Sequence, residues 1–561
     1  MWDTDMHTQD GDCESCISDA SDMSAVAGPT DISTIVTLER LLILGTDGDS
    51  EASKLEHLRT ALHPVLDKIV AEGDAPDIVV TVKEVSGAKR ASRPDAFLYA
   101  LAYCTRCVHE GVRSSALEAI TSVCTTPAML YQFVEFVKHA KGDVGRGGRC
   151  HGRGFRRAVS RWFTDQDAYS LAFTMTKGGR RHNWSAKDML RVAHVRPKKC
   201  SPATALVLKF IVKGTEGLDT SEPESKSDST PEVKRVRDFL VDYAVVKTAT
   251  PADADKVVEL MRRHNLAREH LPLSLLALPA VWAALVERMP FTALVKSLGT
   301  LAKHELLTKG SATGTYVASR LRDGVALRRA GLHPLTVLVA LNQYREGTGL
   351  RGSGQWEVQP HIVDALNDTL SLAFAQTERF DADFSIMIGL DVSGSMQSNL
   401  PCLQLSMRDA AAALTATILR QTTASTVMAF SQGGMILDLD STATYLDVQT
   451  KTENMGFERT NCALPVIRAT ELRIKVGAFV IITDNDTNVG SVSCGDALRA
   501  YNCEMGLYGE KRAKFVVISM EACTFSIAEA GNPDMLDVCG FDTQTQARIF
   551  DFIRGKPTEK E

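Results

Sequence analysis

The sequence predicts a multidomain protein in which an all-α, HEAT-like solenoid is followed by a doubly wound α/β domain. At 561 residues the chain is too long for one hydrophobic core. Apolar residues recur at helical spacing through most of its length, and after residue 376 apolar strands begin to alternate with helices. A hydrophobic content of 44% and a charged content of 24% are ordinary values for globular proteins.

The ends of the chain predict little structure. Residues 1–31 are acidic and rich in Ser, Asp and Thr, which is typical of a disordered tail, and residues 557–561 form a short polar tail. No secretion signal is recognised, and the longest apolar stretch, 273–286, is too short for a membrane span. With 13 scattered cysteines, the chain is expected to keep reduced thiols in the cytoplasm or the nucleus. Two C-x-x-C pairs, at 13–16 and 104–107, lie too far apart to favour a zinc site.

Residues 32–376 are predicted to be helical throughout. Apolar residues spaced three and four apart indicate helices at 58–70, 96–108, 115–123, 129–137, 188–195, 257–266, 281–298 and 335–344. So many short helices without strands cannot form one bundle, and they favour stacked helix pairs with irregular repeats. The low-complexity stretch 215–231 is expected to be a surface loop.

Residues 380–556 are predicted to form the α/β domain. Buried strands are expected at 384–390, 426–430, 478–483 and 515–520. Helices are expected between and after them, at 403–422, 463–475, 495–501 and 545–553. Strands that alternate with helices in this way indicate a parallel sheet with helices on both faces.

Positive charge is concentrated in one part of an acidic chain. Residues 141–200 hold 15 Lys and Arg against 4 Asp and Glu, an excess of +11, so the rest of the chain carries −17. A basic island of this kind indicates a localised site for a polyanion. Glycines at 142–152 are expected to prevent regular structure before the first basic helix begins.

The candidate polyanion-binding residues lie on two predicted helices and the segment between them. Ser185 or Asn183 would cap the second helix. Arginine at i, i+4 spacing suits phosphate, and few acidic partners are near in sequence, so nucleic acid is favoured over a merely solvated face. We expect Trp162, Phe163 and Trp184 to pack between helices rather than stack on bases. The candidate set is Arg153, Arg156, Arg157, Lys177, Arg180, Arg181, Lys187, Arg191 and His194.

Three loops of the α/β domain offer oxygen atoms to a cation. Asp391 ends a buried strand and precedes Ser393 and Ser395, Thr460 opens a later helix, and Asp484 ends another strand. Carboxylates and hydroxyls at the carboxyl edge of a parallel sheet suit a hard cation such as Mg²⁺. Helix capping is a simpler explanation of the same residues. A Mg²⁺-dependent phosphatase built on Asp391 is a further alternative, although Ser393 stands where such enzymes carry a second aspartate.

These loops resemble the metal-ion-dependent adhesion site of von Willebrand factor type A domains. The resemblance implies that Ser393, Ser395 and Thr460 are hydroxyl ligands and that Asp391 and Asp484 coordinate directly or through water. It also implies that an acidic residue of a protein partner completes the coordination. Asn461 replaces the usual aspartate beside the threonine, and Arg459 replaces a small residue, so metal occupancy is less secure than the fold.

Motifs in both parts of the chain resemble the TROVE-domain family of Ro ribonucleoproteins. They include GRGFRRAV at 152–159, NWSAKDMLR at 183–191, MPFTAL at 289–294, TDN at 483–485 and MLDVCGFDT at 535–543. The resemblance runs from about residue 38 to residue 553. Gly178 and Gly179 depart from it, because the family's segment here is more polar and aromatic, and they predict a looser segment.

The family resemblance implies a ring of helical repeats closed by the type A domain. Its outer basic surface would bind small noncoding Y RNAs, and its central hole would take the 3′ ends of misfolded RNAs in RNA quality control. Lys177, Arg181 and His194 would contact Y RNA, with Arg156 and Arg157 as neighbours. We therefore expect a monomeric RNA-binding scaffold that is not an enzyme. A metal-dependent scaffold that binds acidic proteins is the alternative.

Overall fold

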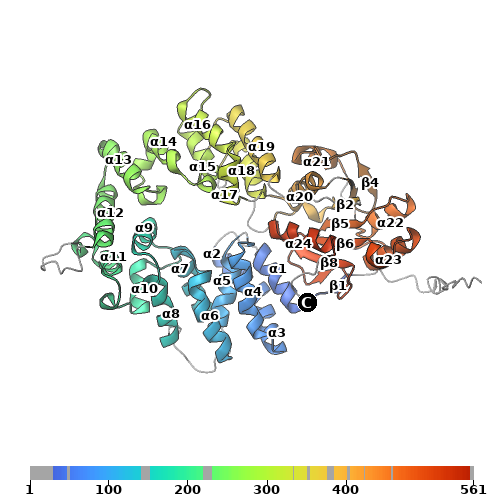
Figure 1. Ribbon diagram of the computed structural model, residues 1–561, viewed down its shortest axis with the longest axis horizontal. Coiled ribbons are helices and arrows are strands. Elements are labelled where there is room, and N and C mark those ends of the chain that lie inside the picture. The colour runs from blue at the N-terminus through green and yellow to red at the C-terminus, as the bar shows by residue number, and fades with distance from the viewer. Residues whose placement is uncertain are drawn as a thin grey trace, which may run out of the picture.

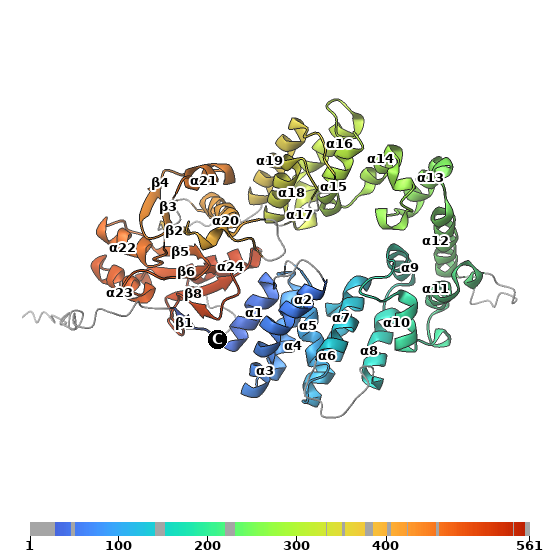
Figure 2. The same ribbon diagram turned by 180° about the vertical axis from the view of Figure 1, so that it is seen from behind.

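The computed structural model describes residues 29–46, 51–91, 93–140, 152–218, 230–332, 334–349, 354–375, 385–400, 405–422, 424–455, 459–541 and 543–555. Most of the acidic tail with the Cys13–Cys16 pair, the stretch 141–151, residues 219–229 of the expected loop and the C-terminal tail lie outside these residues. In Figures 1 and 2 the helices α1 to α19 follow an arc, and the sheet lies between the two ends of that arc. We call residues 34–375 the helical region and residues 385–555 the sheet domain.

The helical region consists of short helices, as the sequence predicts. Their bounds are α1 Thr34–Leu44, α2 Glu51–His57, α3 His63–Glu72, α4 Ala75–Gly87, α5 Asp95–Cys104, α6 Glu110–Val123, α7 Pro127–His139, α8 Arg153–Thr164, α9 Ala168–Lys177, α10 Ala186–Ala193, α11 Pro202–Lys213, α12 Pro231–Thr248, α13 Ala254–His264, α14 Pro279–Arg288, α15 Phe291–Lys303, α16 Ala312–Leu321, α17 Gly324–Ala330, α18 Pro334–Glu346 and α19 Pro360–Ala375. A π-helical turn, Leu58–Leu62, joins α2 to α3.

Several helices of the first part pack on their second neighbours along the chain. Helix α4 contacts α6, α5 contacts α7, and α6 contacts α8. This pattern places alternate helices in the same layer, which confirms the predicted stack of helix pairs. Local signals fix where the helices begin. At α7, for example, the Thr126 hydroxyl accepts a hydrogen bond from the Met129 amide, and Pro127 occupies the first helical position.

The sheet domain contains six strands in the order β4-β3-β2-β5-β6-β8. Their bounds are β2 Ile386–Asp391, β3 Ser425–Phe430, β4 Gly434–Leu437, β5 Ala478–Thr483, β6 Lys514–Ser519 and β8 Met535–Cys539. The helices are α20 Met407–Gln421, α21 Tyr445–Thr452, α22 Leu464–Glu471, α23 Cys494–Glu504 and α24 Thr543–Ile553. Neighbouring strands are parallel except for β4, which pairs antiparallel with β3 at the edge.

The two faces of the sheet belong to different hydrophobic cores. Along β5, Phe479 and Ile481 pack in a core with α22 and α23, for example against Tyr501. Ala478, Val480 and Ile482 point the other way, because successive side chains of a strand alternate between faces. That second face shares one continuous cluster with α20, α24 and the helical region. The sheet is therefore packed on both faces, as continuous apolar strands predict.

The structure contains short elements that the sequence did not predict. Thr30 and Asp31 were expected in the disordered tail, but they form β1, which pairs antiparallel with β7 Phe525–Ser526. Strand β4 was not predicted, because three of its four residues are exposed and the strand lacks a buried run. Strand β8 and helix α21 were also missed, because a charged residue interrupts each apolar pattern.

Both ends of the helical region contact the sheet domain. At the first end, α1 contacts β8, and Arg40 of α1 forms an ion pair with Asp537 of β8 at 2.5 Å. At the other end, α18 and α19 contact α20, and Tyr445 of α21 hydrogen-bonds Asn342 of α18. Within the described residues, no helix combines the length and apolar content that crossing a membrane would require.

Candidate nucleic-acid interface and metal centre

Helix α8 has one apolar face and one arginine face. Trp162 and Phe163 are 1% and 0% exposed, and the Trp162 indole N–H donates to the Cys124 carbonyl oxygen at 2.5 Å. Their predicted role in helix packing is therefore confirmed. Arg153 and Arg157 lie on the opposite, exposed side of the helix. Because the buried aromatic residues fix the rotation of α8, they also fix the direction in which these arginines point.

The nine predicted cationic residues remain accessible after folding. Lys177 and Arg156 are half-buried, and the other seven, Arg153, Arg157, Arg180, Arg181, Lys187, Arg191 and His194, are exposed. Within the part of the chain that the structure describes, one ion pair involves this set, between Arg191 and Asp188 at 3.7 Å. An i, i+3 pair at that distance on an exposed helix contributes little. Most of the positive charge of this surface is thus not neutralised by ion pairs within the described structure.

The segment between α9 and α10 is a defined turn. The backbones of Arg181 and Trp184 exchange hydrogen bonds of 2.9 and 2.8 Å, and His182 and Asn183 between them have φ of 48° and 64°. The Arg180 guanidinium donates to the Asn183 carbonyl oxygen at 3.0 Å. These hydrogen bonds begin at Arg180, so the looser segment expected from Gly178 and Gly179 stays a prediction.

Ser185 is the residue that caps α10. Its hydroxyl accepts from the Asp188 amide at 3.3 Å, and the Asp188 carboxylate accepts from the Ser185 amide at 3.1 Å. These hydrogen bonds hold the pKa of Asp188 below its usual range, with Arg180 and Arg191 adding to the effect. The capping box sets the start of the helix, and it thereby orients Lys187 and Arg191 toward solvent.

A hollow of about 340 Å³ lies beside this turn, and it contains a residue that the sequence did not indicate. Lys138, in the last turn of α7, lies 4.3 Å above the Trp184 ring. Glu135 accepts hydrogen bonds from both Lys138 and the Trp184 indole, each at 2.7 Å. Burial raises the pKa of Glu135, but these hydrogen bonds outweigh it, and the pKa is lowered overall. Arg180 and Arg191 line the same hollow.

A larger hollow of about 940 Å³ lies between α9, α12 and α13. Its lining combines aromatic rings with cations. The Arg235 guanidinium lies 4.1 Å above the Tyr169 ring, and Lys234 beside it is exposed. Lys177 lies over the ring of Phe173, another lining residue, at 5.1 Å, so the hollow adjoins the predicted basic surface. The sequence did not indicate this site, because its cations lie on α12 and α13, outside the basic island.

The candidate metal residues come together at the carboxyl edge of the parallel strands. Asp391 ends β2, Asp484 follows β5, and β2 and β5 are neighbours in register. Thr460 is anchored beside β3, because the next residue donates its amide to the Ser431 carbonyl oxygen at 3.0 Å. In the β2 loop, the Ser393 and Ser395 hydroxyl oxygens are 3.1 Å apart. Parallel pairing thus brings three loops to one place.

The two carboxylates of this site are buried, and one of their oxygens has no hydrogen-bond partner in the described structure. Asp391 and Asp484 are 0% and 3% exposed. Burial and then the neighbouring Asp484 raise the pKa of Asp391 to about 7. The Asp484 Oδ2 atom is buried without a hydrogen-bond partner in the described structure. Buried anionic oxygens without partners are costly, so the residues present fit a divalent cation.

The two departures from the adhesion-site pattern do not block the site. The Asn461 side chain accepts from the Ala463 amide at 3.1 Å, within the turn that precedes α22. Arg459 is exposed, and in the described structure no ion pair joins it to Asp391 or Asp484. Thr460 is 2% exposed, and its backbone is fixed by Asn488, whose side chain accepts from the Thr460 amide at 3.0 Å.

Sites built from His, Cys and carboxylates alone are not found elsewhere in the described structure, where no three such residues gather around one point. Cys104 and Cys107 are buried free thiols. Burial raises the pKa of Cys104 well above that of an exposed thiol, which disfavours the thiolate that zinc requires. The candidate cation site at the sheet edge differs because hydroxyl groups supply most of its oxygens.

An arc of stacked helix pairs joined to a parallel-sheet domain, with carboxylates and hydroxyls gathered at the carboxyl edge of the sheet, defines a class: a helical-repeat protein that carries a von Willebrand factor type A domain. Residues 23–348 match the model of the TROVE domain, and residues 385–553 match that of the Ro60 vWA domain. The chain belongs to the TROVE-domain family of Ro60 proteins.

Relatives match over nearly the whole chain. The RNA-binding protein RO60 of Deinococcus radiodurans is 32% identical, over 92% of this chain and 92% of its own. The RNA-binding protein RO60 of Caenorhabditis elegans is 28% identical, over 94% of this chain and 88% of its own. The crystal structure of the Deinococcus radiodurans RO (RSR) protein superposes with a TM-score of 0.67 at 29% identity, covering 94% of this chain and all of that one.

Proposed function

We propose that this protein is a monomeric RNA-binding scaffold of the cytoplasm or nucleus, without catalytic activity of its own. The observation that carries the proposal is the basic surface of α8 and α10, where seven of nine cationic residues are exposed and one described ion pair opposes them. Arginines on an exposed helix face stay hydrated in the free protein, so holding them there costs no desolvation. Their planar guanidinium groups suit contact with phosphate when RNA binds. Both relatives named above are called RNA-binding proteins, which supports the same conclusion.

The bound RNA is proposed to be a small, folded noncoding RNA of the Y type. Lys177 ends α9, Arg181 lies in the α9–α10 turn, and His194 follows the last residue of α10. These three residues would contact the sugar-phosphate backbone of the RNA, with Arg156 and Arg157 as neighbours. Defined helix and turn geometry favours recognition of RNA shape, because the cations are held at fixed separations. A flexible basic tail would bind any polyanion of sufficient charge, whereas a fixed surface discriminates between folds.

A second part of the proposal concerns the 3′ ends of misfolded RNAs in RNA quality control. Contacts of α1 and of α18 and α19 with the sheet domain support a closed ring, whose central hole would take a single strand. The hollow between α9, α12 and α13 supports this part as well. Its aromatic residues and cations have the chemistry that binds single-stranded nucleic acid, where bases stack on rings or guanidinium planes.

The metal site is proposed to be an adhesion device for a protein partner. Asp391, Ser393, Ser395, Thr460 and Asp484 would hold Mg²⁺, and the unpartnered Asp484 Oδ2 supports this assignment. A bound cation supplies a Lewis-acidic position that a carboxylate of a partner can fill. The chain's own contribution is to hold the oxygens in place by the hydrogen bonds from Thr483 to Asp391 and from the Ser393 amide to Asp391.

The RNA proposal is tested by measuring the affinity for a Y-type RNA hairpin as a function of salt. We compare the wild type with Lys177→Ala/Arg181→Ala. Two lost phosphate contacts are expected to weaken binding about tenfold to a hundredfold and to reduce the salt slope by about 2. Arg262→Ala is the matched control, because it removes an exposed arginine whose charge is already paired with Glu287 at 2.6 Å.

Equal affinity and salt slope for the wild type and the double variant would show that the basic surface is not the RNA site. A loss of log affinity in Arg262→Ala about half that of the double variant, in proportion to the one charge removed instead of two, would instead indicate an effect of overall charge. A duplex of the same length without the hairpin's unpaired segments provides the test of shape recognition, and it is expected to bind more weakly than the hairpin.

A further inference from the structure

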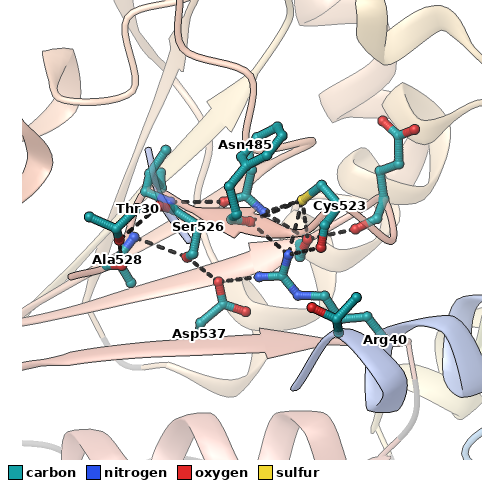
Figure 3. A network of polar contacts seen from close by, with 12 residues as sticks. Thr30, Arg40, Asn485, Cys523, Ser526, Ala528 and Asp537 are labelled. Atoms are coloured by element: carbon teal, nitrogen blue, oxygen red, sulfur yellow. Dashed lines mark hydrogen bonds and ion pairs between the residues drawn. The ribbon is translucent and has the colours of Figure 1, made fainter. Parts of the chain in front are cut away.

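A buried arginine of the helical region ends inside the sheet domain. Arg40 of α1 is 1% exposed, and its Nη1 atom lies 2.9 Å from the carbonyl oxygens of both Cys523 and Phe525 (Figure 3). Its Nη2 atom pairs with the Asp537 carboxylate at 2.5 Å, and the same carboxylate accepts from the Ser526 hydroxyl. The Arg40 guanidinium binds several groups at once, so it holds the segment that carries Cys523 and Phe525 in one conformation.

The thiol of Cys523 connects this arginine to the candidate metal loop. The Cys523 Sγ atom lies 2.9 Å from Arg40 Nη1 and 3.6 Å from the Asn485 side-chain nitrogen. Figure 3 shows the sulfur between the two side chains. Asn485 directly follows Asp484, the residue of the metal site that lacks a partner for Oδ2. The Cys523 sulfur therefore contacts both Arg40, which joins the helical region to the sheet domain, and Asn485, which lies in the candidate metal loop.

Asn485 is held in an unusual conformation by its surroundings. It is fully buried with a φ of 71°, in the left-handed region that a non-glycine residue adopts only at a cost. Its side-chain nitrogen donates to the Ser519 hydroxyl at 2.7 Å, and its side-chain oxygen accepts from the Ile527 amide at 3.3 Å. The loop 519–527 that Arg40 contacts is thus the same loop that stabilises the backbone after Asp484.

The backbone of Asn485 also reaches the second carboxylate of the site. Its amide donates to the Thr483 hydroxyl at 3.2 Å, and that hydroxyl donates to Asp391 Oδ2 at 2.6 Å. A continuous set of contacts therefore runs from Arg40 through Cys523, Asn485 and Thr483 to the Asp391 carboxylate. The Cys523 Sγ atom also lies 3.9 Å from the backbone carbonyl oxygen of Asp484. Cys523 is half-buried, and the other side chains of this set are fully or almost fully buried.

We propose that Arg40 is a positioning residue for the metal site, so that the seating of α1 in the sheet domain and the binding of the cation stabilise each other. The inference rests on the proposed Mg²⁺ site. Coupling of this kind is reciprocal: if losing the Arg40 contact weakens Mg²⁺ binding by some factor, Mg²⁺ strengthens the attachment of α1 by the same factor. The affinity of the sheet edge for the cation would then depend on whether α1 of the helical region is attached to the sheet domain.

The experiment compares three variants of the full-length protein. Arg40→Met removes the guanidinium. Cys523→Ala removes the shared sulfur but leaves the Arg40–Asp537 ion pair and the backbone carbonyl contacts. Arg548→Met is the matched control, because Arg548 of α24 also crosses to α1, pairing with Glu39 at 3.2 Å, away from the metal loop. Mg²⁺ affinity is measured by calorimetric titration with Mg²⁺ alone, and the attachment of α1 by hydrogen exchange of its amides with and without Mg²⁺.

Arg40→Met and Cys523→Ala are expected to raise the dissociation constant for Mg²⁺ by about fivefold or more, and Arg548→Met to leave it within about twofold. In the wild type, Mg²⁺ is expected to slow the exchange of α1 amides, and this effect is expected to vanish in Cys523→Ala. Because Cys523→Ala retains the ion pair, it decides the matter even if Arg40→Met folds poorly.

Two results would overturn the proposal. The first would leave the proposed metal site standing, and the second would remove that site as well. Wild-type Mg²⁺ affinity in both Arg40→Met and Cys523→Ala would show that Arg40 only joins the two parts of the chain, while the metal site itself would stand. No binding of Mg²⁺ by the wild type at millimolar concentrations would remove the metal site and the coupling together.

Discussion

On α8 and α10 the cations lie at the surface, where water solvates them and removing one costs the folded protein little. At the carboxyl edge of β2 and β5, two carboxylates lie buried beside each other, and one of their oxygens has no partner in the described structure. Substitutions on the basic surface should therefore change ligand binding and leave stability alone. Substitutions in the buried pocket should change stability itself, with a sign that depends on pH and on the cation.

The largest expected effect is the pH dependence that Asp391 imposes on the metal-free protein. The folded-state pKa of Asp391 is about 7, against 3.8 for the unfolded chain, because burial and Asp484 disfavour its charged form. Between these values the folded state binds more protons, so the free energy of unfolding falls as pH rises from about 4 to about 7. The full effect is at most about 4 kcal/mol. Chemical unfolding in the presence of a chelator measures it.

Asp391→Asn provides the control for this pH effect, because the amide resembles the protonated acid and does not titrate. The variant is expected to lack the Asp391 contribution and to be more stable than the metal-free wild type near pH 8. If the two proteins lose stability in parallel between pH 4 and pH 8, Asp391 is not the group responsible, and its environment is more polar than the structure indicates.

Mg²⁺ should reverse that destabilisation in the wild type. A ligand at a hundred times its dissociation constant stabilises the folded state by about 2.7 kcal/mol. Asp484→Asn is expected to lose this stabilisation, because Oδ2 of Asp484 is the buried oxygen without a partner. The measurement is the melting temperature of the sheet-domain transition with and without Mg²⁺. An Asp484→Asn protein that still gains full stabilisation would place the cation elsewhere.

On the helical region, Lys234→Ala tests whether the hollow between α9, α12 and α13 binds RNA. Its ammonium group is exposed beside the Arg235–Tyr169 pair, so its loss should weaken binding of a single-stranded oligonucleotide by about 1 kcal/mol, roughly fivefold. Stability should be unchanged. Lys256→Ala is the matched control, because Lys256 is an exposed lysine already paired with Glu259 at 3.1 Å. Equal losses in the two variants would argue against a local site.

The smallest expected effect has the opposite pH dependence and lies in the helical region. His270 is buried, with its ring nitrogens bonded to the Phe173 carbonyl oxygen and the Ala267 amide, each at 3.0 Å. Burial lowers its pKa below the usual 6.5. The unfolded chain therefore takes up a proton first, so stability falls as pH drops below about 6.5.

His270→Gln serves as the comparison for this acid effect, since glutamine can keep a donor and an acceptor but does not titrate. The wild type should lose stability faster than the variant between pH 6.5 and pH 5. Parallel acid unfolding of the two proteins would show that His270 takes up its proton equally well in the folded state.

Sites carried by contiguous motifs could be predicted, whereas sites assembled from separate helices could not. Asp391, Ser393 and Ser395 follow one another in a loop, and the end of a parallel strand dictates where that loop lies. Lys138 and Arg235 belong to helices outside the basic island, and nothing in their local sequence relates them to Trp184 or Tyr169. Strand β4 was missed because it is mostly exposed and has no buried run to mark it.

The sequence by itself determined the helical periodicity, the apolar strands, the excess of positive charge at 141–200 and the loop that carries the metal candidates. These properties depend on residues close together in the chain, where spacing decides which side chains share a face. Only the tertiary structure decided that Arg40 reaches Cys523 across 483 positions, that Asp391 and Asp484 are buried side by side, and that Asp484 Oδ2 has no hydrogen-bond partner in the described structure. Burial and long-range contacts set those energies, and both arise when distant segments pack together.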